Sequence, residues 1–153
     1  GDIKGLCQLM VIHNKSPDDI MKMDANTQQT ILHRVCTFGY VRTLKFVRSI
    51  LSEQSFVDQI FVSNQNDTKP IEYAVRFGRV GVVRFLFQMK SVKEKYANDM
   101  DLQYRLLFHL FVYNKNYRQI INFILTELNI KHRVKEILNH HCSAPAANSN
   151  FHA

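Results

Sequence analysis

Cysteine is scarce in this sequence of 153 residues, and its three cysteines are widely spaced. Cys7 and Cys36 lie within apolar helical patterns, where a free cysteine behaves as a small hydrophobic residue. An odd, widely spaced set is not typical of a disulfide-stabilised secreted domain. The cysteine pattern therefore favours a reducing compartment, and we expect a cytoplasmic or nuclear protein.

Long apolar runs are also absent. No run approaches the roughly 18 residues of a membrane-spanning helix, so we expect no membrane insertion. Residues 1–11 lack the basic region and the small-residue cleavage site of a signal peptide. Because the sequence does not begin with methionine, we expect it to be an excised part of a longer protein.

The motifs of common catalytic and nucleotide-binding sites are missing as well. The sequence contains no GxGxxG, GxxxxGK[ST], GxSxG or HExxH pattern. His140, His141 and Cys142 are the only compact group of metal-capable side chains, and no second group could complete a zinc site. Cys36 has no convincing histidine partner for nucleophilic catalysis. We therefore expect no enzyme activity, no metal and no cofactor.

The composition that remains is that of an ordered, basic domain. Apolar residues make up 46% of the chain and charged residues 22%, enough apolar material for a continuous core. Residues 69–95 contain seven basic and two acidic side chains, a difference of +5 within a net charge of +7. A concentrated positive field steers an acidic partner toward it, although a solvated helical face explains the same pattern.

Two segments of the chain align with each other without gaps. Residues 30–47 and 69–86 superpose at an offset of 39 residues, so that Phe38-Gly39 coincides with Phe77-Gly78. Fainter copies place Asn14 and Asn116 at the position of the glycine.

Glycine and asparagine readily adopt the left-handed conformation that follows a helix C-terminus. The repeated segments therefore predict helix–turn–helix units with positive φ at Gly39 and Gly78. Each unit is too small to bury its own apolar face and does so by stacking on its neighbours.

These segments resemble ankyrin repeats, whose common pattern is Thr-Pro-Leu-His-x-Ala-x-x-x-Gly-His-x-x-Val-Val-x-x-Leu-Leu. The matching residues are Thr30, Leu32, His33, Gly39, Leu44 and Val47 in one unit and Pro70, Ile71, Ala74, Gly78, Val82, Val83 and Leu86 in the next. The resemblance implies an all-α, ankyrin-type solenoid of helical hairpins with capping helices. It also implies that His33 bonds backbone in the preceding turn; His109, in an apolar helix, is interpreted as a core histidine.

The chain departs from the ankyrin pattern in its period, which is 39 and 38 residues rather than about 33. We expect the extra residues 52–61 to form a lengthened outer helix or an extra short one. The expected domain spans residues 1–142, followed by a flexible tail at 143–153. Its expected units are residues 1–23, 24–62, 63–100 and 101–142, with about seven to nine helices in all.

The resemblance also implies where a partner binds. Turn tips and the exposed side of each first helix form the concave surface of the ankyrin architecture. The candidate binding residues there are Arg34, Thr37, Phe38, Tyr73, Arg76 and Phe77. An aromatic residue repeated beside arginine is typical of an interface hot spot. The alternative is that Phe38 and Phe77 pack against the neighbouring unit.

The expected function is a non-catalytic protein–protein interaction module within a larger scaffold, signalling or effector protein. Its expected partner is another protein, with an acidic surface. The alternative is a basic helical-repeat domain that binds nucleic acid, which the isoelectric point of about 9.5 and the aromatics between the charges favour. A steep dependence of binding on salt would identify that alternative.

Overall fold

The computed structural model describes residues 3–113 and 118–143. Over these residues it contains eleven α-helices, one π-helix and one 3-10 helix, and no strand. The prediction of an all-helical protein is thus confirmed. None of the helices described is both long and apolar enough to cross a membrane. The predictions for Asn116 and for the tail after residue 143 lie outside the described residues.

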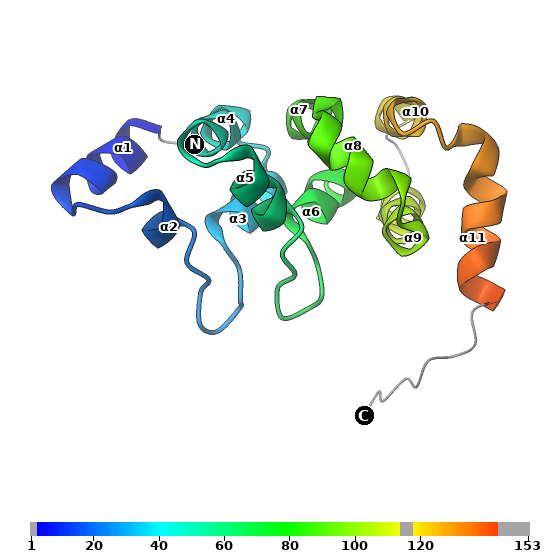
Figure 1. Ribbon diagram of the computed structural model, residues 1–153, viewed down its shortest axis with the longest axis horizontal. Helices are drawn as coiled ribbons and strands as arrows, with labels where there is room; N and C mark the ends of the chain where they lie inside the picture. Colours follow the sequence, from blue (N-terminus) through cyan, green and yellow to red (C-terminus); the bar gives the residue numbers. More distant parts are fainter. Residues whose placement is uncertain (1–2, 114–117, 144–153) are drawn as a thin grey trace.

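The main helices form two layers (Figure 1). One layer contains α3 (Ile31–Phe38), α6 (Pro70–Arg76) and α9 (Met100–Phe108); the other contains α4 (Val41–Ile50), α7 (Val80–Gln88) and α10 (Arg118–Glu127). Neighbours within a layer contact each other, as α3 does with α6 and α4 with α7. The π-helix η1 (His109–Tyr113) continues α9 and packs against α6. Helices α3 and α4 thus form the first hairpin, α6 and α7 the second, and α9, η1 and α10 the third.

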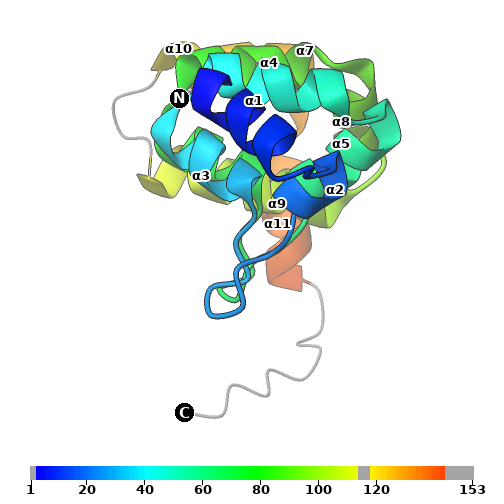
Figure 2. The same cartoon turned by 90° about the vertical axis from the view of Figure 1, so that its left-hand side faces the viewer.

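Shorter helices flank these hairpins. They are α1 (Ile3–Ile12), α2 (Pro17–Ile20), α5 (Glu53–Ile60), α8 (Lys90–Ala97), η2 (Lys131–Arg133) and α11 (Val134–Ser143). Figure 2 shows α5 and α8 at the same edge of the array. Helix α11 packs against α9 and buries Ile137, as expected for a final helix with one apolar face.

The turns within the first two hairpins depend on glycine. Gly39 has a φ of 77° and Gly78 a φ of 62°, which confirms both predicted turn positions. In this left-handed geometry the main-chain N–H groups of Gly39 and Tyr40 both donate to the carbonyl of Val35, each at 3.0 Å. Asn14, at its fainter turn position, also has a positive φ, of 47°.

The residues added to each unit fold as separate helices. Leu51 ends α4 with a ψ of 154°, and Met89 ends α7 with a ψ of 125°, so the chain is extended at both points. The side chain of Ser52 then caps α5 by accepting a hydrogen bond from the Ser55 N–H. The expectation of about seven to nine helices was wrong, since the described residues contain eleven α-helices. For residues 52–61 the alternative of an extra short helix is confirmed by α5.

The core runs through all three hairpins and continues under the added helices. Its fully buried side chains include Leu32, Leu44, Phe56, Ile71, Leu86, Leu106, Ile124 and, nearly so, Tyr96. Phe56 belongs to α5 and Tyr96 to α8, where Tyr96 stacks on Phe87 of α7. The short helices therefore cover apolar surface that the hairpins leave open.

Two loops, residues 22–30 and 61–69, project in the same direction from the layers (Figures 1 and 2). Each contains one non-glycine residue with positive φ: Gln28 at 54° and Asp67 at 53°. The main-chain N–H of Gln65 donates to the carbonyl of Thr27 at 3.3 Å. The two loops are therefore joined directly, and they extend the contact between the first and second hairpins.

Candidate functional site

The first and second hairpins are joined through His33. Its Nδ1 accepts the Thr30 main-chain N–H at 3.0 Å, so Nε2 carries the proton and donates to the carbonyl of Thr68 at 3.1 Å. Burial lowers the pKa of His33, which keeps the ring neutral. The histidine bonds backbone in its own preceding turn, as predicted, and it also holds the next loop.

The second and third hairpins are joined by different chemistry. Glu72, 39 residues after His33, is 2% exposed and accepts the Lys69 main-chain N–H at 2.9 Å. Arg105 of α9 donates from Nε to Oε1 of Glu72 at 2.7 Å and from Nη1 to Asp67 at 2.8 Å. A second Arg105 nitrogen, Nη2, donates to the Asp67 carbonyl. No sequence motif predicted this cluster.

The buried carboxylate of Glu72 is neutralised within the protein. Burial raises its pKa, but hydrogen bonds from His109, Arg105 and the Lys69 N–H lower it more, to about 2. His109 Nε2 lies 3.5 Å from Glu72 Oε2, and His109 is buried in η1, as expected for a core histidine. Because both carboxylate oxygens of Glu72 already accept hydrogen bonds from neighbouring residues, Glu72 has a structural role.

The two repeated phenylalanines lie on the surface. Phe38 is 55% exposed and stacks on Tyr40, with 5.7 Å between ring centroids. Phe77 is 40% exposed and stacks on Tyr73, with 6.0 Å between centroids and 4° between ring planes. Neither side chain is buried against the neighbouring unit, so both remain available to a partner.

Five side chains form a continuous series of ring and cation contacts. In order they are Arg79, Phe77, Tyr73, Arg76 and Tyr113, here called the arginine–aromatic stack. The guanidinium carbon of Arg79 lies 6.0 Å from the Phe77 centroid, and that of Arg76 lies 5.2 Å from Tyr73 and 4.5 Å from Tyr113. This series of two cations and three rings thus connects the second hairpin to the third.

Hydrogen bonds with the first hairpin, the third hairpin and a projecting loop hold the stack in place. Arg79 Nε donates to the carbonyl of Thr37 in the first hairpin at 2.7 Å, and Arg76 Nε donates to His109 Nδ1 in the third at 3.4 Å. The Tyr73 hydroxyl accepts a hydrogen bond from Asn64 at 3.0 Å, and its ring lies edge-on to His33 at 6.2 Å. Each member except Phe77 therefore contacts a residue of another hairpin or a projecting loop.

The structure groups the predicted site residues only in part. Tyr73, Arg76 and Phe77 belong to the stack, and Thr37 contributes its carbonyl to Arg79. The Thr37 hydroxyl is used within α3, where it donates to the His33 carbonyl at 2.7 Å. Phe38 rests on Tyr40, and Arg34 lines a separate pocket described below.

Three members of this surface were missed: Arg79, Tyr113 and Tyr40. Arg79 and Tyr40 follow the turn glycines, where the ankyrin pattern has histidine, and that departure was a usable signal. Tyr113 is 47% exposed on the π-helix, in a segment where the repeat pattern is weak.

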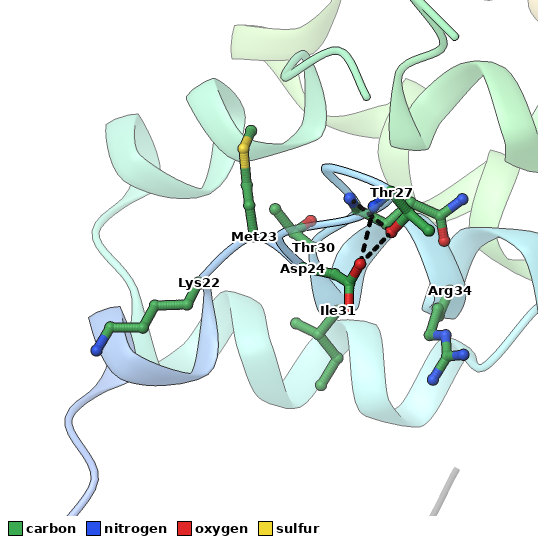
Figure 3. A pocket seen from close by; sticks show the side chains of 8 residues that line it. Lys22, Met23, Asp24, Thr27, Thr30, Ile31 and Arg34 are labelled. Atoms are coloured by element: carbon green, nitrogen blue, oxygen red, sulfur yellow. Dashed lines mark hydrogen bonds between the residues drawn. The ribbon is translucent and has the colours of Figure 1, made fainter. Parts of the chain in front are cut away.

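A pocket of about 410 Å³ lies beside the first projecting loop (Figure 3). It is lined by Lys22, Met23, Asp24, Thr27, Gln29, Thr30, Ile31 and Arg34. The Asp24 carboxylate accepts the main-chain N–H groups of Asn26 at 3.0 Å and Thr27 at 2.8 Å. These bonds, the one to Thr27 foremost, lower the pKa of Asp24. Asp24 thus shapes the loop.

The basic stretch 69–95 does not form one positive surface. Lys90 lies 3.6 Å from Glu94, Lys93 lies 3.2 Å from Glu127, and Lys95 lies 3.9 Å from Asp58. By contrast, neither arginine of the stack forms an ion pair with any carboxylate of the described residues. Lys69 and Arg84 of the same stretch also form none there, so four of its seven basic side chains, two of them in the stack, have no carboxylate partner among the described residues.

Comparison with known proteins leaves the family open, since no protein-family model, curated protein or solved structure matches the chain. No group of three or more His, Cys, Asp or Glu side chains that could hold a metal ion occurs in the part of the chain that the structure describes. The side chains of His141 and Cys142 lie outside that part. Function is therefore inferred from the stack and its surroundings.

Proposed function

We propose that the protein is a non-catalytic, ankyrin-type module that binds another protein through the arginine–aromatic stack. The observation that carries the proposal is the stack itself, in which the exposed rings of Phe77 and Tyr113 and the half-buried ring of Tyr73 contact two arginines. Neither arginine has a carboxylate partner among the described residues. Tyrosine and arginine are, with tryptophan, the residue types enriched among the hot spots near the centres of protein interfaces. Of the six predicted residues, Tyr73, Arg76 and Phe77 belong to this surface, and we infer that Phe38, stacked on Tyr40, extends it.

Three features support the ankyrin type. The turn glycines adopt the left-handed conformation that the repeat requires. His33 makes the main-chain hydrogen bond expected of its position in the family pattern. The projecting loops join each other through a main-chain hydrogen bond, as neighbouring repeats of one array would.

The stack is suited to binding because its side chains are held before a partner arrives. Ordering a long side chain at an interface costs roughly 0.5–1.5 kcal/mol. Arg76 and Arg79 already donate from Nε to His109 and Thr37, and each lies over a ring. A partner therefore meets cations and rings whose geometry is largely fixed.

A non-catalytic role is supported by the hydrogen bonding of the Glu72 carboxylate and the burial of the Cys36 thiol. Both oxygens of Glu72 accept hydrogen bonds from Arg105, and one of them also accepts the Lys69 N–H. Burial raises the pKa of the Cys36 thiol, which disfavours the reactive thiolate. Neither group is arranged to act on a bound substrate.

The experiment that tests the proposal compares two double variants of the intact chain in quantitative affinity capture. Arg76→Glu with Phe77→Ala should lower the affinity for the captured protein at least tenfold, roughly 1.4 kcal/mol, with little change in Tm. The control, Arg84→Glu with Val11→Ala, alters an exposed charge and an exposed apolar side chain away from the stack and should bind normally. An equal loss of stability in the first variant would show that these residues are structural.

A further inference from the structure

We infer that the stack recognises a partner segment in which acidic side chains flank an apolar one. The inference rests on the proposed function and adds the chemistry of the partner.

The charge of the stack calls for an anion. Arg105, a third arginine between hairpins, has both Glu72 and Asp67 as carboxylate partners. Arg76 and Arg79 have none among the described residues, where each donates a hydrogen bond from Nε alone. Their terminal nitrogens are therefore available, and a carboxylate pairs with such a guanidinium edge through two parallel hydrogen bonds.

The rings between and beside the arginines call for an apolar group. Phe77 is 40% exposed, Tyr113 is 47% exposed, and Phe108 is 42% exposed with its ring 6.0 Å from that of Tyr113. Two rings, Phe77 and Tyr73, separate the guanidinium groups of Arg79 and Arg76 along the stack. A segment that uses both arginines therefore carries separate acidic side chains and places an apolar one against the rings.

A protein segment fits these features better than single-stranded nucleic acid does. A nucleic-acid strand is bound by a row of cations that follows its successive phosphates, with bases stacked on aromatic rings. The rings are present, but Lys90, Lys93 and Lys95 pair with carboxylates of the protein. Two unpaired arginines match a short acidic peptide.

The test selects peptides from a random displayed library on the intact chain. Enriched peptides should contain Asp or Glu on both sides of a large apolar residue. Their affinities are then measured in solution with the unaltered protein, Arg76→Glu, Arg79→Glu, Phe77→Ala and the control Arg84→Glu. We expect at least tenfold weaker binding for the three stack variants and no change for the control.

A charge exchange identifies the contact itself. Replacing an acidic residue of the selected peptide with lysine should abolish binding to the unaltered protein and restore it with Arg76→Glu or Arg79→Glu. Thermal melts establish whether each variant is folded. If Arg76→Glu does not fold, Arg76→Gln replaces it as a milder variant. A labelled oligothymidylate is measured with the same proteins.

The outcomes separate the two proposals. Peptides without acidic residues, sensitive to Phe77→Ala but not to charge reversal, would overturn the acidic partner and leave the binding surface intact. If peptides bind every stack variant with unchanged affinity, or if no peptide is enriched, the proposal that the stack is a binding surface would be overturned as well. Tight binding of oligothymidylate that the stack variants abolish would replace the protein partner with nucleic acid.

Discussion

The guanidinium carbon of Arg76 lies 4.5 Å from the ring centroid of Tyr113, so a side chain of α6 is held by the π-helix of the next hairpin. Tyr113 in turn stacks on His109, which accepts the Arg76 Nε–H. The position of this arginine therefore depends on the third hairpin, although its sequence pattern belongs to the second.

A double-mutant cycle measures this contact. Arg76→Met and Tyr113→Leu should each lower the free energy of unfolding modestly, with a coupling of roughly 0.5–1 kcal/mol, as expected for a partly exposed cation–ring pair. Urea denaturation of the four proteins provides the values. Strictly additive effects would mean that the two side chains do not interact in solution.

The free energy of unfolding should fall at acidic pH because Glu72 becomes protonated. Its pKa in the folded protein is about 2, below the ordinary value of 4.5. The carboxylate therefore stabilises the fold above about pH 4.5, and this contribution is lost as the pH falls toward 2. Glu72→Gln should lower the free energy of unfolding at pH 7 by on the order of 2–3 kcal/mol.

Measuring the Glu72→Gln variant at several pH values distinguishes the effect of the Glu72 charge from the effect of its packing. The difference in unfolding free energy between the unaltered protein and Glu72→Gln should shrink between pH 4.5 and pH 2, as measured by denaturant titration across that range. Glu94→Gln, in an exposed pair on α8, is the control and should change stability little. A difference that stays constant with pH would show that Glu72 acts by shape alone.

The two turn glycines should differ in their tolerance of substitution. Gly78→Val should cost on the order of 1–2 kcal/mol, because a β-branched residue is strained in the left-handed region. Gly39→Val should cost more, since a Cβ there would lie 3.1 Å from Cδ of Arg79. Gly39→Asn, which tolerates positive φ better, is the matched control. Thermal melts in which Gly78→Val is neutral would contradict the assignment of the turn.

Cys36 should be protected from thiol reagents in the folded protein. It is buried in α3, and burial raises the pKa of its thiol, so little thiolate forms at neutral pH. Peptide-resolved mass spectrometry should show Cys7, which is partly exposed, labelled first, and Cys36 labelled only after addition of denaturant. Equal labelling rates without denaturant would mean that α3 opens readily.

The parts of the fold that could be predicted depend on local sequence. The turns at Gly39 and Gly78 could be predicted because few residue types other than glycine readily adopt positive φ. The offset of 39 residues also relates the sequences of the two hairpins directly. The separate helices α5 and α8 were harder to predict, because Leu51 and Met89, which break the outer helices, are ordinary apolar residues in extended conformation.

The candidate site could be predicted only where the repeat was clear. Phe77 repeats Phe38 at the offset of 39 residues, and Arg76 directly precedes it, so both were found. The ion pair of Arg105 with Glu72 joins residues 33 apart, and Arg105 with Asp67 joins residues 38 apart. Nothing in either local pattern indicates that these residues meet. Tyr113 lies on a π-helix, whose spacing differs from that of an α-helix.

His33 and Glu72 occupy equivalent positions in successive hairpins, yet one donates to a loop carbonyl and the other accepts from an arginine. If the first two hairpins changed places, the Glu72 carboxylate would be buried beside a carbonyl oxygen, and Arg105 would lose its main counter-ion. The hairpins are therefore not interchangeable building blocks. The junction between the second and third hairpins requires the Glu72 carboxylate beside the Arg105 guanidinium, so a buried ion pair restricts the order of the hairpins.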